Sequence, residues 1–221
     1  PHARLSPPFA QPYGQLDSAV AELAQAVGRE AAPLPIGEAA YYLTGLYTTL
    51  LATRERGARG AFYTPPALAT RLLDMAEEQG VDWSKARVLD PASGGGAFLL
   101  PAAERMIAAL PAADPAFVLR QIGARLLGLE LDPYAAGFGQ NAIELLLADV
   151  TAAAGRDAPV IVRVADTLEE PPSARFDLVI GNPPYGRVTL TPEQRRRFAR
   201  GLYGHANLYG VFTDIAVRWT R

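Results

Sequence analysis

The 221-residue chain contains no cysteine and only two histidines. The missing thiols exclude disulfides and thiolate metal sites, and they fit a reducing, cytoplasmic location. Two histidines leave little for an imidazole metal site, so no metal is expected. No apolar run approaches the length of a membrane span, and no signal peptide is visible. We therefore expect no membrane partner.

The chain also lacks a strong excess of charge of either sign. It has 21 basic and 23 acidic residues, which gives a formal net charge of −2. No global basic field indicates a nucleic-acid partner, so any basic surface must be local. Apolar residues make up 49% of the chain and charged residues 20%, as in a globular protein with a real core. The length corresponds to one large domain or somewhat more.

The first quarter of the chain differs in pattern from the rest. Residues 1–15 are rich in proline and polar residues and predict an extended arm. Residues 16–56 predict amphipathic helices, interrupted at APLPIG, that pack on a larger body. We assign residues 1–57 to an N-terminal arm and helical segment, and 58–221 to the main domain. The apolar positions expected to face that domain are Leu16, Val20, Leu23, Val27, Leu43, Leu46 and Leu50.

From residue 60 onward, strand and helix patterns alternate. Strands are expected at ARVLDPA, RLLGLELDP, PVIVRVADTL and FDLVIGNPPY, and helices at 97–110, 133–147, 192–200 and 207–220. Another helix is expected with Thr64 as N-cap, Pro65 at its first position, and Leu68, Leu72 and Leu73 facing inward. This alternation predicts βαβ units and a parallel sheet, and hence an α/β fold.

A glycine turn, SGGG, directly follows the first predicted strand and Asp90. Such a turn lets the backbone approach a ligand closely and aims a helix N-terminus at it. Gly94 and Gly96 match the start of a dinucleotide fingerprint, but the third glycine is absent, which weakens a dinucleotide interpretation. Taken alone, the turn fits a purely structural role as well as it fits a ligand-binding role.

Acidic residues end the next two predicted strands. Glu130 lies in an otherwise apolar strand, at a position where a carboxylate suits a ribose diol. Asp132 precedes Pro133 and is expected to cap a helix. Asp166 ends the third strand, where it could accept a hydrogen bond from an adenine amino group. Taken alone, it is more typical of an acidic residue in a surface loop.

The fourth predicted strand runs directly into Asn182-Pro-Pro-Tyr185. Two prolines remove two backbone N–H donors and end the strand abruptly, at the edge where open α/β sheets bind ligands. By themselves these prolines fit an ordinary turn equally well. The four strand ends taken together are much more specific than any one of them.

The combined pattern resembles the S-adenosylmethionine-dependent amino-methyltransferases, and most closely the N6-adenine DNA methyltransferases of restriction-modification and phage-exclusion systems. The resemblance covers about residue 58 to the end. The family's glycine motif usually reads Asp-Pro-Ala-Cys-Gly-Ser-Gly-x-Phe-Leu. Ser93 stands here at the cysteine position and Gly95 at the serine position. Both residues are small, so cofactor binding is expected to survive.

The resemblance implies a Rossmann-like class I sheet, S-adenosylmethionine as cofactor, and double-stranded DNA with a flipped target adenine as partner. Thr64 would help hold the methionine carboxylate, and Asp90 would lie near the ammonium group. Glu130 would bind the ribose hydroxyls and Leu131 would pack on the adenine of the cofactor. Asp166 would take its amino group, with the backbone of Thr167 alongside. The implied cofactor-binding set is Thr64, Asp90, Pro91, Ala92, Gly94, Gly96, Glu130, Leu131, Asp166 and Thr167, and the implied catalytic set is Asn182, Pro183, Pro184 and Tyr185.

The resemblance gives the tetrapeptide a chemical meaning. The exocyclic nitrogen of adenine is a poor nucleophile because its lone pair is delocalised into the ring. The Asn182 side-chain oxygen and the Pro183 carbonyl can accept its two hydrogens, so that the lone pair points at the methyl group. Tyr185 can stack on a base that has left the duplex.

Two segments near the end of the chain have alternative interpretations. TPEQRRRFARG predicts a helix with a capping box from Thr191 to Gln194. Its arginines either contact DNA phosphates or form a solvated face. The aromatic residues of NLYGVF, residues 207–212, are expected in core packing. The four arginines concerned are Arg195, Arg196, Arg197 and Arg200.

Two other functions stay open. Release-factor glutamine methyltransferases share Asn-Pro-Pro-Tyr, although GAFYTPP and the form DPASGGGAF argue against them. A non-catalytic DNA- or cofactor-binding subunit is the second alternative. A full sheet of this kind has about seven strands and only four are predicted here, so we expect the cofactor-binding half of a longer enzyme, with a target-recognition domain or an additional subunit elsewhere.

Overall fold

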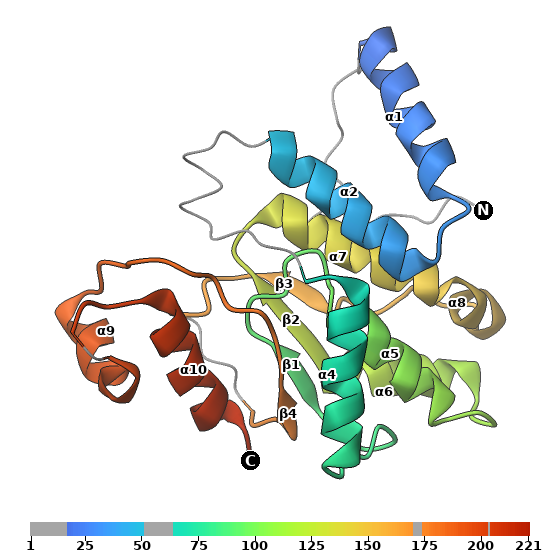
Figure 1. Ribbon diagram of the computed structural model, residues 1–221. Helices are drawn as coiled ribbons and strands as arrows, with labels where there is room; N and C mark the ends of the chain where they lie inside the picture. Colours follow the sequence, from blue (N-terminus) through green and yellow to red (C-terminus); the bar gives the residue numbers. More distant parts are fainter. Residues whose placement is uncertain (1–16, 51–63, 170–173, 203) are drawn as a thin grey trace.

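The computed structural model describes residues 17–50, 64–169, 174–202 and 204–221 (Figure 1). The predicted arm at 1–15 lies outside these ranges. So does the proposed boundary between residues 57 and 58, which stays a prediction. Among the described helices, none is long and apolar enough to cross a membrane.

Four parallel strands form one sheet, in the order β3-β2-β1-β4. The strands are β1 (Val88–Asp90), β2 (Leu126–Glu130), β3 (Val162–Val164) and β4 (Leu178–Val179). β1 is central and pairs with β2 on one side and with β4 on the other. The four predicted strands and the α/β class are thereby confirmed, and all four carboxyl ends meet at one edge.

Helices cover both faces of this sheet. They are α4 (Pro66–Glu78), α5 (Leu99–Ala108), α6 (Pro115–Arg125), α7 (Pro133–Leu146), α8 (Ala148–Ala154), α9 (Pro192–Arg197), a 3-10 turn η1 (Ala199–Gly201) and α10 (Leu208–Trp219). Along β1 the side chains alternate between faces, as strand geometry requires. Val88 joins the main core with residues of α5, α6 and α7, whereas Leu89 packs in a smaller cluster that includes Phe176 and Trp219.

Two helices precede this body, α1 (Ser18–Ala31) and α2 (Ile36–Leu50). The predicted packing is wrong for α1, which has no buried residue and projects from the body in Figure 1. α2 does pack on α7, but with a different face. Its buried residue is Thr44, whereas Leu46 and Leu50 are exposed. Small side chains on α2 allow a close approach to the glycine turn, and Leu46 and Leu50 consequently point outward, whereas Leu43 is half-buried.

The start of α4 also differs from the prediction. The helix begins at Pro66 with Pro65 as N-cap, and no side chain caps it. Thr64 is instead buried, only 5% exposed, beside the cavity described below. The inward face is formed by Ala69 and Leu73, while Leu68 and Leu72 are exposed.

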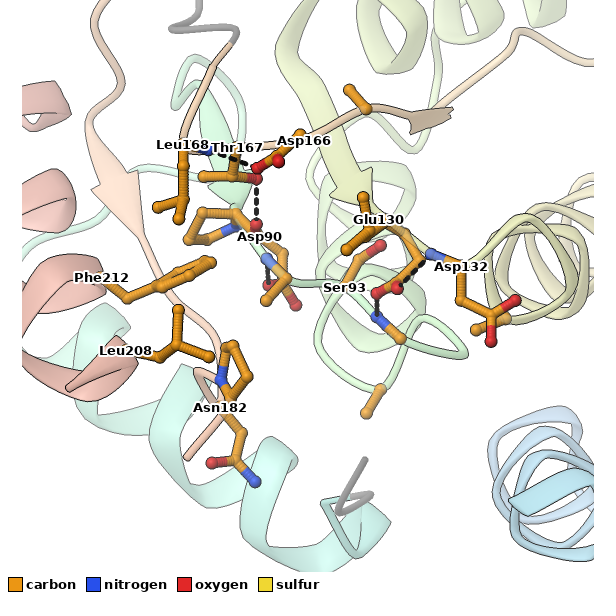
Figure 2. Close-up of a pocket in the computed structure, with 18 of the residues that line it drawn as sticks. Asp90, Ser93, Glu130, Asp132, Asp166, Thr167, Leu168, Asn182, Leu208 and Phe212 are labelled. Carbon is orange, nitrogen blue, oxygen red and sulfur yellow. Dashed lines mark hydrogen bonds between the residues drawn. The ribbon is translucent and has the colours of Figure 1, made fainter. Parts of the chain in front are cut away.

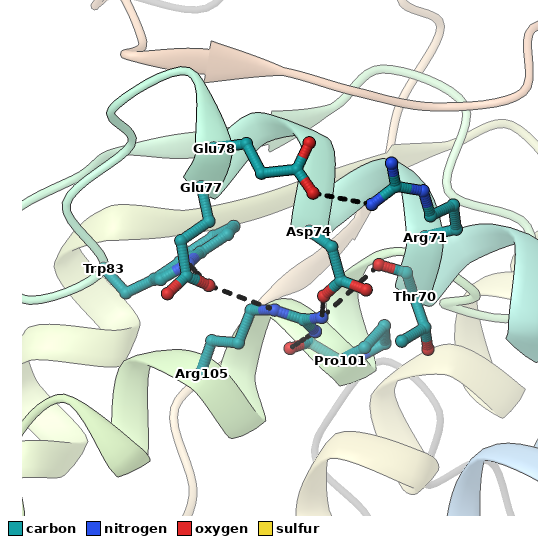
Figure 3. A network of polar contacts seen from close by, with 8 residues as sticks. All are labelled: Thr70, Arg71, Asp74, Glu77, Glu78, Trp83, Pro101 and Arg105. Carbon is teal, nitrogen blue, oxygen red and sulfur yellow. Dashed lines mark hydrogen bonds and ion pairs between the residues drawn. The ribbon is translucent and has the colours of Figure 1, made fainter.

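An arginine on α5 holds α4 in place (Figure 3). Arg105 forms an ion pair with Asp74 at 2.5 Å and donates to the Thr70 carbonyl at 3.4 Å. Its guanidinium also lies over the Trp83 ring, and the Trp83 indole donates to Glu77. Arg105 is largely buried, with 18% of its side chain exposed, whereas its partner Asp74 is 45% exposed, so solvent screens the ion pair in part. The clamp fixes the helix that immediately follows Thr64.

Candidate active site at the carboxyl edge of the sheet

A cavity of about 510 Å³ lies at the carboxyl ends of the strands. Figure 2 shows Glu130 and Asp132 on one side, Asn182, Leu208 and Phe212 on the other, and Asp90 between them. The structure brings eleven of the fourteen predicted site residues to this cavity. These are Thr64, Asp90, Pro91, Ala92, Gly94, Glu130, Leu131, Asp166, Thr167, Asn182 and Pro184.

Three predicted residues do not line the cavity. Gly96 faces a second hollow of about 220 Å³ between α2, α4 and α5. Pro183 and Tyr185 belong to the segment that borders the main cavity, but their side chains are not part of its lining. Leu131 lines the cavity and is still 66% exposed.

The glycine turn needs its glycines for two different reasons. Gly94 and Gly96 have positive φ angles of 51° and 85°, which side chains of L-residues rarely adopt. The turn also contacts α7 at Gly139, because a Cβ on Gly139 would lie 3.2 Å from the Gly95 carbonyl carbon. A glycine on a neighbouring helix thus allows the close packing of turn and helix.

Gly95 has a further neighbour in α2. A Cβ on Gly95 would clash with the Thr44 side chain, which is 1% exposed and donates to the Ala40 carbonyl. Serine usually occupies this position in the family that the motif resembles. In this chain the missing side chain makes room for the threonine. The sizes of residues 44 and 95 are therefore coupled, because a larger residue 95 would require a smaller residue 44.

Glu130 ties the end of β2 to the glycine turn. One carboxylate oxygen accepts from the Gly94 N–H at 2.8 Å, and the other accepts from the Asp132 N–H at 2.8 Å. Burial raises the pKa of Glu130, and these two N–H groups oppose the shift. Each oxygen keeps a second lone pair, so the carboxylate can still accept hydrogen bonds from a ligand.

Asp132 caps α7, as predicted, by accepting from the Tyr134 N–H at 2.9 Å. Its second oxygen accepts from the hydroxyl of Tyr47 on α2 at 2.8 Å. The Tyr47 ring also contacts the rings of Tyr134 and Phe138. Sequence reasoning missed this link because it joins residues 85 positions apart, with no local signal.

Asp90 is almost fully buried, at 1% exposure, and accepts from the Ala92 N–H at 3.0 Å. Burial raises its pKa to about 8, the neighbouring Glu130 adds to the shift, and the Ala92 N–H opposes it. A Cβ on Gly181 would lie 2.5 Å from an Asp90 carboxylate oxygen. Gly181 therefore lets the segment leading to Asn182 pass directly beside this acid.

The loop after β3 closes another side of the cavity. Asp166 accepts from the Leu168 N–H at 2.9 Å, and the Thr167 hydroxyl donates to the Pro91 carbonyl at 2.6 Å. The bond from Thr167 to Pro91 connects the ends of β3 and β1. The cavity lining contains four aspartate or glutamate residues, and no lysine, arginine or histidine contributes to it from the described parts of the chain. Such a cavity favours a cationic ligand.

α10 supplies a wall that the sequence did not reveal. Leu208 and Phe212, four residues apart on one helix face, line the cavity together with Val188. Phe212 is buried, as expected, but the prediction of core packing is wrong for Tyr209, which is 51% exposed. Tyr209 stacks on Tyr185 instead. The proximity of NLYGVF to the tetrapeptide in the sequence was the available signal.

The predicted arginine helix has the expected capping box. Thr191 Oγ1 accepts from the Gln194 N–H, and the Gln194 side chain accepts from the Thr191 N–H. Arg197 donates to the Leu168 carbonyl at 3.0 Å, which attaches the helix to the loop after β3. The other three arginines, Arg195, Arg196 and Arg200, are exposed.

Comparison with known proteins identifies the family of this chain. The model of the N-6 DNA Methylase family matches residues 41–207. The Type II methyltransferase M.PaeR7I of Pseudomonas aeruginosa is 34% identical over 71% of this chain and 29% of its own length. The Type II methyltransferase M.TthHB8I of Thermus thermophilus is 31% identical over 73% of this chain and 32% of its own length. The chain thus spans about a third of these curated relatives.

Solved structures share the fold. A DrdV–DNA complex superimposes with a TM-score of 0.62 at 16% identity, covering 84% of this chain and 22% of that one. A modification subunit of a putative type I restriction enzyme from Vibrio vulnificus superimposes with a TM-score of 0.52 at 24% identity, covering 83% of this chain and 36% of that one. The parallel sheet with its covering helices is therefore a Rossmann-like α/β fold, and, by the family match over residues 41–207, the chain belongs to the N-6 DNA methylase family.

Proposed function

We propose that this chain is the cofactor-binding and catalytic part of a site-specific DNA methyltransferase. It transfers a methyl group from S-adenosylmethionine to the N6 amino group of adenine, in a restriction-modification or phage-defence system. The observation that carries this proposal is the shared cavity. Asp90, Glu130 and Asp166 line it together with Asn182 and Pro184, so one space joins the cofactor residues to the catalytic segment.

The residues present fit S-adenosylmethionine. The volume of about 510 Å³ is in the range of small-molecule sites, which is about 300–1,000 Å³. The sulfonium and ammonium groups of the cofactor are cationic, and the cavity is lined by acids. Glu130 and Asp166 retain acceptor capacity for hydroxyl and amino hydrogens. Phe212 and Leu131, which both line the cavity, offer apolar surfaces for a planar ring.

The bound cofactor supplies an activated methyl group, and the protein positions the acceptor nitrogen. In this proposal the Asn182 side-chain oxygen and the Pro183 carbonyl accept the two hydrogens of the adenine amino group, and Tyr185 stacks on the base. Two prolines fix the carbonyl directions and donate no competing N–H. Positioning of this kind corresponds to effective molarities of about 10⁵–10⁸ M.

A local basic segment supports a nucleic-acid partner. Residues 185–205 contain five arginines and one glutamate, a formal charge of +4 in a chain whose total is −2. The segment begins at Tyr185, the last residue of the proposed catalytic tetrapeptide, and its Arg197 donates to the carbonyl of Leu168, which lines the cavity. We propose that the exposed arginines of this segment bind DNA phosphates. A target-recognition domain or further subunit would supply the remaining contacts, and a cytoplasmic location stays a prediction.

Radiolabelled S-adenosylmethionine tests substrate and reaction together. The full-length protein is offered duplex DNA and, separately, a release factor, and the DNA is digested to nucleosides. Label in N6-methyladenine supports the proposal. Label in the release factor would identify a glutamine methyltransferase. Absence of label from both, with cofactor binding shown by calorimetry, would favour a non-catalytic subunit.

A further inference from the structure

Tyr185 and Tyr209 form a parallel ring stack at the edge of the site. Their ring centroids are 5.8 Å apart and their planes differ by 13°. Tyr185 ends the catalytic tetrapeptide, whereas Tyr209 lies in the first turn of α10. This geometry is an offset stack, one of the arrangements that aromatic pairs prefer.

Main-chain hydrogen bonds hold the two tyrosines in this relationship. Arg187 and Asn207 form an antiparallel bridge. The Leu208 N–H donates to the Gly186 carbonyl at 3.0 Å, and the Val188 N–H donates to the Ala206 carbonyl at 3.1 Å. The segment that follows Tyr185 is thus paired with the segment that precedes Tyr209.

The side chain of Asn207 adds a helix cap to this arrangement. It accepts from the N–H of Tyr209 itself at 3.0 Å, which fixes the first turn of α10. Two other residues of this helix, Leu208 and Phe212, line the same cavity as Asn182. The start of α10 is therefore built into the site.

Core packing does not explain this pair, because both rings remain about half exposed. Tyr185 is 49% exposed and Tyr209 is 51% exposed. With the ring centroids 5.8 Å apart, Tyr209 lies against part of one face of the Tyr185 ring, and about half of Tyr185 remains exposed. An exposed ring that is supported by a second ring on one face is a suitable stacking surface for a nucleobase.

We propose that Tyr209 is a positioning residue that supports Tyr185 from behind, so that the extruded target base stacks on the free face of Tyr185. The base then continues a three-ring column. Tyr209 touches neither the reacting atoms nor the cofactor in this arrangement and acts only through Tyr185. The inference rests on the proposed function, because it takes a nucleobase as the substrate.

A double-mutant cycle in the full-length enzyme tests this role. Tyr209→Ala is expected to lower kcat/KM for duplex DNA roughly 2- to 12-fold, the effect of one aromatic pair. Affinity for S-adenosylmethionine is expected to stay unchanged. Tyr209→Phe keeps the ring and is expected to retain the kcat/KM of the wild type. Val217→Ala, at a position 72% exposed on the same helix, is the matched control.

The double-mutant cycle shows whether Tyr209 acts through Tyr185 or independently of it. In the Tyr185→Ala background, Tyr209→Ala is expected to cause no further loss, because no ring remains to be supported. 2-Aminopurine at the target position reports base stacking in the same variants. Its fluorescence is expected to be more quenched by stacking in the wild type than in Tyr209→Ala.

Three results would overturn the inference. They are an unchanged kcat/KM in Tyr209→Ala, a multiplicative loss in the double variant, and a loss of cofactor affinity, which would indicate a purely structural role. Failure of the proposed function is distinguishable from all three. In that case the wild-type enzyme itself places no label on adenine.

Discussion

The hydroxyl of Tyr47 on α2 donates to Asp132 Oδ2 at 2.8 Å, which connects the N-terminal helices to the cap of α7. Asp132 in turn donates its N–H to Glu130, and Glu130 accepts from the Gly94 N–H. This chain of contacts runs from α2 through the end of β2 to the glycine turn. α2 is accordingly part of the support of the proposed cofactor site.

Tyr47→Phe is expected to weaken both folding and cofactor binding. The change removes one hydrogen bond to a nearly buried carboxylate, at a cost of about 1–3 kcal/mol in the free energy of unfolding. Urea denaturation and calorimetry with S-adenosylmethionine measure the two effects. Tyr42→Phe is the matched control, because Tyr42 lies on the same helix and is 59% exposed. Equal changes in stability and cofactor affinity in Tyr47→Phe and Tyr42→Phe would contradict the supporting role of Tyr47.

Gly95→Ser introduces the side chain that is usual in the family, and it is expected to destabilise this protein. The new Cβ meets Thr44, and overpacking of this kind costs about 1–3 kcal/mol. Thr44→Ala in the same chain is expected to recover much of the loss by removing the obstructing atoms. Thermal unfolding of the two single variants and the double variant measures the coupling. Additive effects would show that residues 44 and 95 do not interact.

The affinity for S-adenosylmethionine is expected to rise with pH toward and through about 8. Burial raises the pKa of Asp90 to about 8, so the free protein holds a proton there near neutral pH. A cationic ligand favours the carboxylate and therefore displaces that proton. Calorimetry in buffers of different ionisation enthalpy is expected to detect proton release in the wild type, and none from this site in Asp90→Asn.

The same group makes the stability of the free protein depend on pH. The folded-state pKa of Asp90 lies above its ordinary value of 3.8. The folded state therefore binds more protons, and the contribution of Asp90 to stability is lost as pH rises from about 4 to about 8. Urea denaturation of wild type and Asp90→Asn across this range measures the difference. A difference that does not vary with pH would contradict the assignment.

Asn182→Ala is expected to abolish methyl transfer while leaving cofactor affinity nearly intact. The substitution removes an acceptor for the amino hydrogens of the target base and leaves Asp90, Glu130 and the glycine turn in place. Thr189→Ala, an exposed position in the same segment, serves as control. Transfer assays with labelled cofactor decide the matter. Persistent transfer in Asn182→Ala would show that the tetrapeptide is not the catalytic element.

Removal of two exposed arginines, Arg195→Ala with Arg196→Ala, is expected to weaken DNA binding by a similar factor for all sequences. Phosphate contacts carry no sequence information, and each one contributes about one unit to the slope of log affinity against log salt. Titrations at several salt concentrations in the full-length protein measure this slope. Arg156→Ala, also exposed but distant in the sequence, is the control. An unchanged slope in the double variant would assign these arginines to a merely solvated surface.

Local signals in the sequence predicted much of this molecule. The four strands, the Asp132 cap with Pro133, and the capping box at Thr191 depend on neighbouring residues, and all are present in the structure. The positions of the strand ends follow from parallel topology. Hence most of the predicted site residues converge on one cavity.

The errors arise where a distant contact outweighs a local pattern. Thr64 has the chemistry of a helix cap, but burial beside the cavity places it outside that role. The leucines of α2 follow a helical period, yet Thr44 faces the body because only a small residue fits over Gly95. Tyr209 is an aromatic residue in an apolar segment, which is typical of the core. Its partner Tyr185 could be identified only from the positions of β4 and α10 in space.

The strand order also determines when the site can form. β1 begins at Val88 and pairs with β2 from Leu126, but its other neighbour, β4, begins only at Leu178. During synthesis from the N-terminus, the glycine turn, Glu130 and Asp166 can therefore assemble on β1, β2 and β3 before the proposed catalytic segment has been synthesised. Among the four strands β4, which leads to Asn182, is synthesised last, and it has the longest loop to close. In a nascent chain the residues proposed to bind the cofactor can thus be in place before the segment proposed to carry out the transfer.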